Sequence, residues 1–279
     1  MIGLLDLGGT KLLAAVTDGH GGPGPAVRRP TPSERPLETL CELLDEVRGG
    51  GTLEAIGMAV PGPFEREKLT LIDPPGMPHT WHGLELGRLL GERYGCSVSI
   101  ENDANCAALA EARFGAGRTH RTVVYFTVST GIGTGVVCDG KLVIARHDTE
   151  GGHQVLWPRW LGGPECDCGG HGCLETLASG RALKRRYGQR PEEIDDPAAW
   201  EEEGRWLGLA AVNATALLDP DVIVFGGGVV HNWEKFEASL HQTVREALHL
   251  QPAPHIVRAQ LGDDRNLWGA LALVDLVPR

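Results

Sequence analysis

No uninterrupted apolar run in this 279-residue sequence approaches the length that a membrane span requires. The first residues also lack the basic segment of a signal peptide, and Asp6 interrupts the first apolar run. Four cysteines are scattered through ordinary segments, as expected for reduced thiols: Cys41, Cys96, Cys106 and Cys138. These features predict a cytoplasmic protein that does not enter a membrane.

Positive charge is also scarce. The 26 basic and 37 acidic residues give a formal net charge of -11, which argues against a general nucleic-acid binder. The Walker motif G-x4-G-K-[ST] is absent, and no helix follows the glycine turns near the start of each half as a Rossmann fingerprint requires. The chain is long enough for two modest domains or one large one.

Residues 150–175 have almost no regular periodicity but contain a histidine and three cysteines: His153, Cys166, Cys168 and Cys173. Three thiolates and one imidazole are the ligand set of a closed tetrahedral zinc site. Intervening glycines suit a tight knuckle, which a structural metal would order. A disulfide with one free cysteine, or unpaired buried thiols, are the alternatives.

Such a knuckle would fix Glu150 and His153 on one side and Glu175 on the other. Polar side chains could then converge on one small ligand. A ligating histidine usually offers its second ring nitrogen to an outer partner, and for His153 that partner could be a substrate hydroxyl.

Two glycine-rich turns follow apolar β-type segments. In the first, Asp6 ends a strand, and the N–H groups of Gly8, Gly9 and Thr10 are predicted to face an anion. The second, residues 130–135, repeats the strand–turn–strand pattern, which suggests a duplicated lobe. Each turn alone could be only a hairpin; paired with an acidic strand end, the two are typical of a phosphate clamp.

Asn102 and Asp103 follow a predicted strand and begin an alanine-rich helix over residues 104–114. Either side chain could serve only as a helix N-cap. A carboxylate at this position is also well placed to act as a general base. The glycine run at residues 226–228 could let a nucleotide lie close to the backbone, or could be a permissive turn.

Three other segments carry simpler expectations. Residues 19–36 are rich in glycine and proline and predict an exposed loop. Residues 61–83 form a loop too long to be a connector, which is typical of a binding loop. A helix over residues 174–187 ends in a basic cluster at 184–186, interpreted as a solvated helix terminus.

In this order, the motifs resemble the ROK family of sugar kinases, the bacterial glucokinase group of the actin/hexokinase superfamily. The resemblance covers nearly the whole chain, and the combination of E-x-G-H with C-x-C-G-x2-G-C-L-E is highly specific. It rests on six motifs: DLGGTK at 6–11, ENDAN at 101–105, STGIGTG at 129–135, EGGH at 150–153, CDCGGHGCLE at 166–175 and FGGGVV at 225–230.

The resemblance implies an α/β, two-lobed, actin-like ATPase fold of ribonuclease-H-like domains, with an interlobe cleft and a zinc knuckle. The expected division is a small N-terminal lobe of residues 1–115 and a large C-terminal lobe of residues 116–279 that carries the knuckle. The C-terminal helix is expected to be able to pack back on the small lobe. The family commonly forms dimers, so a homodimer is the expected assembly.

The resemblance also implies ATP-dependent phosphorylation of a hexose hydroxyl, with glucose to glucose 6-phosphate as the first choice. An N-acetylated amino sugar, mannose or fructose is the alternative substrate. Asp103 would be the general base, and the sugar hydroxyls would be bound by Asn102, Glu150, His153 and Glu175.

ATP, Mg²⁺ and a structural Zn²⁺ are the implied cofactors. Asp6 would orient the magnesium-bound phosphates, and the other residues near ATP would be Gly8, Gly9, Thr10, Lys11, Thr130, Gly131, Gly133, Gly227 and Gly228. The zinc ligands would be His153, Cys166, Cys168 and Cys173.

Three segments depart from the family pattern. Residues 145–149, usually rich in glycine and alanine, read Ala-Arg-His-Asp-Thr, which leaves the shape of the sugar pocket open. The loop before Trp81 is longer and carries an Asp-Pro-Pro sequence at 73–75. Residues 265–270 replace an expected Ala-Gly pair.

Two other function classes, a repressor and a non-catalytic sugar sensor, fit the sequence less well. The sugar-responsive repressors of this family carry a DNA-binding module ahead of the D-x-G-x-T-K strand, which here begins at Ile2. A sugar sensor without catalysis is disfavoured because Asp103 and both glycine turns are retained. The motifs do not distinguish among hexoses, phosphoryl donors or oligomeric states.

Overall fold

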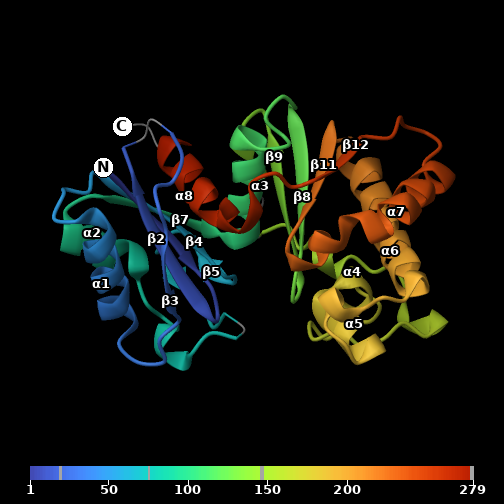
Figure 1. The fold of residues 1–279 in the computed structure, drawn as a ribbon, viewed down its shortest axis with the longest axis horizontal. Coiled ribbons are helices and arrows are strands. Elements are labelled where there is room, and N and C mark those ends of the chain that lie inside the picture. Colours follow the sequence, from blue (N-terminus) through green and yellow to red (C-terminus); the bar gives the residue numbers. More distant parts are fainter. Residues whose placement is uncertain (19–20, 75, 145–147, 277–279) are drawn as a thin grey trace. The chain divides into compact units, whose positions relative to one another are not determined.

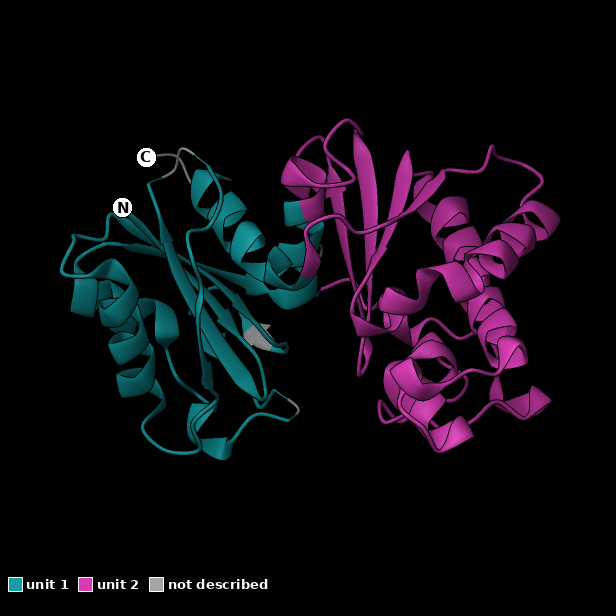
Figure 2. Cartoon of the chain, viewed as in Figure 1, with its two compact units in different colours: residues 1–110, 263–279 teal, residues 111–262 magenta. Residues whose placement is uncertain are grey.

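Two five-stranded sheets, one in each of two units, form the framework of this α/β protein (Figure 1). Unit 1 comprises residues 1–110 and 263–279, and unit 2 comprises residues 111–262 (Figure 2). This computed structural model describes four ranges of the chain: residues 1–18, 21–74, 76–144 and 148–276.

Both sheets have the same topology. In unit 1 the order is β3-β2-β1-β4-β7, and the strands are β1 (Ile2–Leu7), β2 (Lys11–Thr17), β3 (Val27–Pro30), β4 (Ala55–Val60) and β7 (Ser97–Asn102). In unit 2 the order is β10-β9-β8-β11-β12, and the strands are β8 (Thr122–Val128), β9 (Ile132–Cys138), β10 (Lys141–Leu142), β11 (Val222–Gly226) and β12 (His255–Arg258). In each sheet two antiparallel pairs are followed by two parallel pairs. The predicted duplication is therefore confirmed.

In unit 1, helices cover both faces of the sheet (Figure 1). The helices are α1 (Pro36–Arg48), α2 (Leu86–Tyr94), α3 (Asp103–Phe114) and α8 (Arg265–Leu276). Leucines of α1 and α2 join one apolar cluster with one side of β1, β2 and β4. On the other side, a Cβ at Gly57 would lie 2.0 Å from the carbonyl oxygen of Ala270. Glycine therefore allows α8 to lie directly on β4.

In unit 2, the core is built from the sheet and four helices: α4 (Leu174–Ala178), α5 (Gly180–Tyr187), α6 (Pro197–Leu218) and α7 (Trp233–Ala247). Helices α6 and α7 approach closely because α6 presents glycines to α7. A Cβ at Gly204 would lie 2.4 Å from the carbonyl oxygen of Phe236. Aromatic rings of Phe126, Phe225 and Trp233 fill the space beside the sheet.

Short elements complete the chain. They are the hairpin strands β5 (Phe64–Glu65) and β6 (Thr70–Leu71) and the 3₁₀ helices η1 (His79–Trp81), η2 (Gly151–His153), η3 (Arg159–Leu161), η4 (Pro191–Glu193), η5 (Gly228–Asn232) and η6 (Gly262–Asp264). The hairpin and η1 lie inside the segment 61–83, which is therefore only partly a loop.

Three expectations about local structure were wrong. Residues 19–36 contain β3, which is an edge strand. Pro30 has no N–H to donate, and an edge strand tolerates it because its outer side does not pair within the sheet. The predicted helix 174–187 is two helices, because Ser179 caps α5 by accepting the N–H of Ala182 at 3.1 Å. The second glycine turn ends earlier than predicted, since β9 already begins at Ile132.

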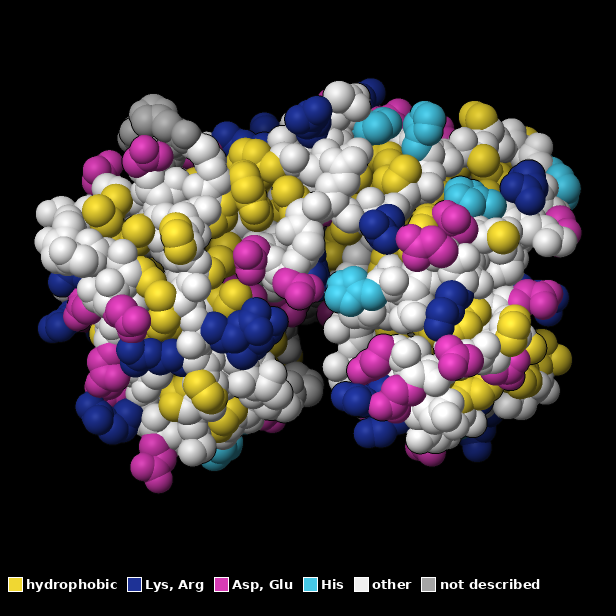
Figure 3. Space-filling model, viewed as in Figure 1, with side chains coloured by type: hydrophobic (Ala, Val, Ile, Leu, Met, Phe, Trp, Pro, Cys, Tyr) yellow, Lys and Arg dark blue, Asp and Glu magenta, His cyan; other side chains and the backbone are white. Residues whose placement is uncertain are grey.

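None of the described helices is long and apolar enough to cross a membrane. On the face drawn in Figure 3, acidic and basic side chains are interspersed over each unit rather than gathered into one large patch of one sign.

Candidate active site

The parallel strands of unit 1 bring Asp6 and the start of α3 to one edge of the sheet. Asp6 is in register with Ala59 of β4, and Ala59 is in register with Glu101 of β7. Because the carboxyl ends of parallel strands meet at the same edge, Asp103, two residues after Glu101, follows at that edge.

Asp103 is the first residue of α3 and is half-buried. Its Oδ1 accepts the N–H of Ala104 at 2.8 Å. Asn102 Oδ1 accepts the same N–H at 2.9 Å and that of Asn105 at 3.4 Å. Asn102 is therefore an N-cap, the simple role that the sequence allowed for either residue. The sugar contact of Asn102 stays a prediction.

The surroundings of Asp103 raise the pKa of its carboxyl group. Burial and, to a smaller extent, the negative charge of Asp6 raise the pKa of Asp103 to about 6, while the N–H of Ala104 and the guanidinium of Arg265 oppose this rise. A carboxylate with a pKa just below neutral is ionised at pH 7 and is basic enough to accept a proton.

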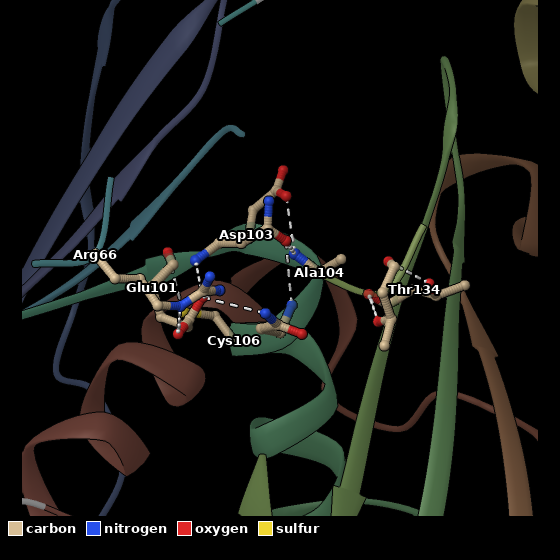
Figure 4. A network of polar contacts seen from close by, with 9 residues as sticks. Arg66, Glu101, Asp103, Ala104, Cys106 and Thr134 are labelled. Carbon is tan, nitrogen blue, oxygen red and sulfur yellow. Dashed lines mark hydrogen bonds and ion pairs between the residues drawn. The ribbon is translucent and has the colours of Figure 1, made fainter. Parts of the chain in front are cut away.

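A partly buried ion pair holds the turn that leads into α3 (Figure 4). Arg66 donates to both carboxylate oxygens of Glu101, with Nη2 to Oε1 at 2.6 Å and Nε to Oε2 at 3.1 Å. Glu101 Oε1 also accepts the N–H of Asn102 at 2.7 Å and Nδ2 of Asn105 at 3.1 Å. The carboxylate of Asp103 lies on the other side of the helix start from this pair. Glu101, Arg66 and Asn105 thereby hold the backbone turn that precedes Asp103.

Sequence reasoning assigned no role to these supporting residues. Glu101 and Asn105 lie within the ENDAN motif, so the motif itself could have indicated them. Arg66 precedes Glu101 by 35 positions in an irregular segment, and no local pattern connects the two.

Asp6 is almost fully buried at the end of β1. Asn266 Nδ2 donates to Asp6 Oδ1 at 2.9 Å. Burial raises the pKa of Asp6, whereas the hydrogen bond from Asn266 and the charge of Lys11 lower it. Asn266 belongs to the segment that departs from the family pattern, and only the fold reveals its contact with Asp6.

The turn between β1 and β2 has fewer free amides than predicted. The N–H of Gly8 donates to the carbonyl oxygen of Lys11 at 2.9 Å, so it closes the hairpin and does not face an anion. The N–H of Thr31 donates to the carbonyl oxygen of Thr10 at 3.1 Å. Among the described residues, none accepts a hydrogen bond from the N–H groups of Gly9 and Thr10. These two N–H groups therefore stay candidates for phosphate binding.

In unit 2, the side chain of Glu175 in α4 contacts the turn between β8 and β9. Its Oε2 accepts the N–H of Ile132 at 2.9 Å. A Cβ at Gly131 would lie 2.5 Å from the same oxygen, so a larger residue there would have to displace the carboxylate of Glu175. Gly133 lies in β9 opposite Thr127. Thr130 and Gly131 therefore form the turn itself, whereas Gly133 does not.

The segment that carries Glu150 is fastened to β9. Thr134 Oγ1 donates to the carbonyl oxygen of Thr149 at 2.7 Å and accepts the N–H of Gly151 at 2.9 Å (Figure 4). A Cβ at Gly152 would lie 1.9 Å from the carbonyl oxygen of Ile132. These contacts fix the position of the backbone at Glu150.

Three of the predicted sugar-binding residues, Glu150, His153 and Glu175, are near enough to interact electrostatically. Loss of hydration raises the pKa of Glu150; His153 opposes the rise, while Asp148 and Glu175 add to it. In the atypical segment 145–149, residues 145–147 lie outside the described part of the chain.

The histidine and three cysteines of the knuckle come together in unit 2. Their ligand atoms all lie within 4.8 Å of one another. His153 Nδ1 is 3.6 Å from Cys166 Sγ, and Cys168 Sγ is 3.7 Å from Cys173 Sγ. Zinc bonds of about 2.3 Å to sulfur and about 2.1 Å to nitrogen predict tetrahedral edges of roughly 3.8 Å and roughly 3.6 Å. The four residues can therefore hold one metal ion in a closed site.

The disulfide alternative is wrong for this segment. All seven cysteines are free, and the 3.7 Å between Cys168 and Cys173 is far longer than an S–S bond of about 2.05 Å. His153 faces the cluster with Nδ1, which leaves Nε2 as the nitrogen that could reach a ligand.

A cavity of about 730 Å³ lies within unit 2 beside the β8–β9 turn. Three predicted ATP-binding residues lie in or next to it: Thr130 and Gly228 line it, and Gly227 precedes Gly228. A Cβ at Gly227 would lie 2.3 Å from the carbonyl oxygen of Val128, whereas one at Gly228 would meet open space. Gly227 is thus required by packing, and Gly228 leaves the cavity open.

The basic cluster at 184–186 is more than a solvated helix terminus. Lys184 lines the cavity, together with Arg181 and Arg190. Arg185 donates to the carbonyl oxygen of Thr176 at 3.2 Å, and Arg186 donates to that of Leu177 at 2.7 Å. These carbonyls belong to the last turn of α4, where no intrahelical donor is available. The cavity lining thus carries three basic side chains and one acidic one, Glu192, an excess of positive charge that suits an anionic ligand.

Comparisons with known proteins cover almost the whole chain. A model of the ROK family matches residues 2–276. The glucokinase of Streptomyces coelicolor is 30% identical over 96% of both chains. An N-acetyl-D-glucosamine kinase of Escherichia coli is 32% identical over 96% of this chain and 97% of its own, and a fructokinase of Zymomonas mobilis is 33% identical over 97% and 95%.

Solved structures give the same result. A ROK hexokinase from Thermus thermophilus superposes with a TM-score of 0.88 at 37% identity, covering 98% of this chain and 97% of its own. A ROK glucokinase from Streptomyces griseus, crystallised with glucose and AMPPNP, has a TM-score of 0.81 at 30% identity and covers 98% of both chains.

Loss of one knuckle thiolate is expected to release the metal and destabilise unit 2. We predict that Cys168→Ser purifies without stoichiometric zinc and that its Tm falls on the order of 10 °C, because a loop ordered by metal loses its constraint. Metal analysis and calorimetry measure both effects. Cys96→Ser, outside the knuckle, is the control and keeps the metal. Full zinc content and an unchanged Tm in Cys168→Ser would contradict the assignment.

Proposed function

This chain belongs to the ROK family and is a sugar kinase; from that premise we propose that it transfers the γ-phosphate of ATP to glucose, forming glucose 6-phosphate. The observation that carries the proposal is Asp103, half-buried at a helix start whose preceding turn is held by the Glu101–Arg66 pair. Two glucokinases among the relatives support glucose. An N-acetylated amino sugar or fructose is the alternative, because relatives of similar identity carry those names.

In the proposed reaction Asp103 accepts the proton of the sugar hydroxyl as its oxygen attacks the γ-phosphorus. The new O–P bond replaces the bond between the γ-phosphorus and the bridging oxygen, and ADP leaves. Phosphoryl transfer has a loose transition state, so the hydroxyl loses its proton late and a carboxylate is a sufficient base. The remaining requirement is to position the two reactants and to neutralise charge.

The phosphates are assigned to Asp6, to the β1–β2 turn and to the β8–β9 turn. Asp6 offers a buried carboxylate of which one oxygen already accepts Asn266 Nδ2, so the other can orient magnesium-bound water or phosphate. Magnesium, when bound with ATP, neutralises charge on the phosphates. Lys11 at the start of β2 adds a positive charge beside Asp6. We assign the adenosine to the cavity of unit 2, next to Gly228.

The sugar hydroxyls are assigned to Asn102, Glu150, His153 and Glu175. Glu175 uses one oxygen for the N–H of Ile132, and its second oxygen is assigned to a hydroxyl. With Nδ1 of His153 on the metal, Nε2 is assigned to another hydroxyl.

The proposed knuckle metal is Zn²⁺, because three thiolates with one imidazole at these distances suit a tetrahedral structural site. The ligating thiols must be reduced, which fits the predicted cytoplasmic location. A homodimer stays a prediction from the family resemblance.

Removing the proposed base should stop turnover without unfolding the protein. We predict that Asp103→Asn binds glucose with a similar Kd but loses about 10²–10⁴-fold in kcat, the usual contribution of a general base. A coupled ATP assay and calorimetric titration with glucose provide the two readouts. Asp195→Asn, whose side chain is 98% exposed, is the matched control. Near-normal turnover in Asp103→Asn would mean that another group is the base.

Asp103 also predicts a pH dependence. Its carboxyl must be ionised to act, so kcat/KM is expected to fall tenfold per pH unit below about pH 6. Stability changes in the opposite direction, because the folded-state pKa lies above the ordinary value of 3.8. The wild type should lose stability relative to Asp103→Asn as pH rises from about 4 to 6. A pH-independent difference between the two unfolding curves would refute the raised pKa.

A comparison of hexoses decides the substrate. Glucose, N-acetylglucosamine, mannose and fructose are supplied singly with ATP, and kcat/KM is expected to be highest for glucose. These sugars differ mainly around C2, so selectivity should come from contacts there. A higher kcat/KM for another sugar would replace glucose and retain the kinase. Absence of turnover with every sugar, together with thermal stabilisation by one of them, would favour a non-catalytic sensor.

A further inference from the structure

Three metal-binding side chains meet in unit 1, in the long segment before α2 that the proposed reaction does not use. They are Asp73, His79 and His82, and one ligand atom from each lies within 4.8 Å of the other two. We call this group the His-Asp cluster. It belongs to the segment that is longer than the family pattern.

The fold holds both histidines on a rigid base. Residues three apart in a 3₁₀ helix lie nearly above one another, so η1 places His79 and His82 on one side. Trp81 between them is fully buried, and its Nε1 donates to the carbonyl oxygen of Pro32 at 2.9 Å. Thr80 Oγ1 donates to the carbonyl oxygen of Ser33 at 2.9 Å. Both rings are therefore presented by anchored backbone.

Nδ1 of His82 lies between two other ligand atoms. It is 2.8 Å from Nδ1 of His79 and 2.9 Å from Oδ1 of Asp73. A neutral imidazole has one proton and one lone pair, so Nδ1 is either a donor or an acceptor. As an acceptor it would face the carboxylate without a proton between them. As a donor it would have to share one proton between two neighbours.

The second nitrogen of His82 gives no relief. His82 Nε2 is buried and has no hydrogen-bond partner among the described residues. A doubly protonated ring leaves a buried N–H unpaired, and so does a neutral ring whose Nδ1 binds a metal, so Nε2 does not distinguish these two states. The arrangement around Nδ1 does, because a cation among the three atoms would accept the lone pairs of both Nδ1 atoms and of the carboxylate.

We propose that the His-Asp cluster binds a divalent transition-metal ion of the zinc, cobalt or nickel class. Metal–ligand bonds of about 2.1 Å at the right angles of an octahedral cobalt or nickel site predict ligand–ligand distances of roughly 3.0 Å, close to the 2.8 Å and 2.9 Å of the two shorter contacts. A tetrahedral zinc site predicts roughly 3.4 Å and would need the three atoms to move slightly apart. Two imidazoles and one carboxylate suit these metals and not magnesium, which prefers oxygen ligands. Three protein ligands leave positions for water.

The position of the cluster gives the metal a structural consequence. Asp73 has a φ of 47°, a left-handed conformation that turns its carboxylate toward the histidines at a cost to the backbone. Three residues later, the carbonyl oxygen of Gly76 lies so close to Gly9 that a Cβ there would be 2.9 Å away. Metal binding would thus fix the segment that packs on the β1–β2 turn.

Titration of the untagged, zinc-loaded holoenzyme with Co²⁺ tests this site separately from the knuckle. Calorimetry should show one added site per chain in the wild type, with affinity at least tenfold weaker in Asp73→Asn and in His79→Gln. Both side chains are exposed, so neither change should prevent folding. The exposed His249→Gln is the control and should bind as the wild type does.

The absorption spectrum identifies which ligands hold the cobalt. Co²⁺ bound by imidazole and carboxylate gives weak visible bands, whereas Co²⁺ exchanged into the knuckle adds intense sulfur-to-metal absorption in the near ultraviolet. We expect only the weak bands for the added equivalent. No added site in the wild type, equal affinity in all four proteins, or sulfur absorption that accounts for all the binding would overturn the proposal. In that case hydrogen bonds, and not a metal, join the three side chains.

Discussion

The parallel register of β1, β4 and β7 is the constraint on which the catalytic edge of unit 1 depends. It aligns Asp6 with Ala59 and Ala59 with Glu101, so two carboxylates from distant parts of the chain reach one sheet edge. Burial and the charge of Asp6 then raise the pKa of Asp103. The acid–base character that we assign to Asp103 is therefore a property of strand pairing as much as of the residue itself.

Unit 2 has the same sheet topology but holds a different set of candidate side chains. Its hairpin turn is closed by Glu175, and the segment of Glu150 is fastened to β9 where only glycine fits against Ile132. The knuckle residues stand between these two carboxylates in the sequence and converge at distances that suit one tetrahedral metal. One ligand set can thereby set the spacing of both side chains, although neither is itself a ligand.

Residues outside the motifs support the candidate residues of each unit. In unit 1, Arg66 pairs with Glu101 and Asn266 binds Asp6, and in unit 2, Arg181 and Lys184 line the cavity. The two contacts in unit 1 leave no periodic signal, because each joins positions far apart in sequence. The same reason hid the His-Asp cluster, whose Asp73 and His82 meet only when the segment before α2 is folded.

The sequence by itself indicated the duplicated strand–turn–strand pattern and the candidate ligands of the knuckle, because glycine turns, thiolates and strand-end carboxylates are local features. The order of these motifs carried the resemblance to the family, and the resemblance implied the two-lobed α/β fold. Tertiary structure decided which amides are free at the β1–β2 turn, where the β8–β9 turn ends and what surrounds each carboxylate. Hydrogen bonding and burial depend on partners that only chain folding brings into contact, and they determine the pKa of Asp103 and the charge of the cavity.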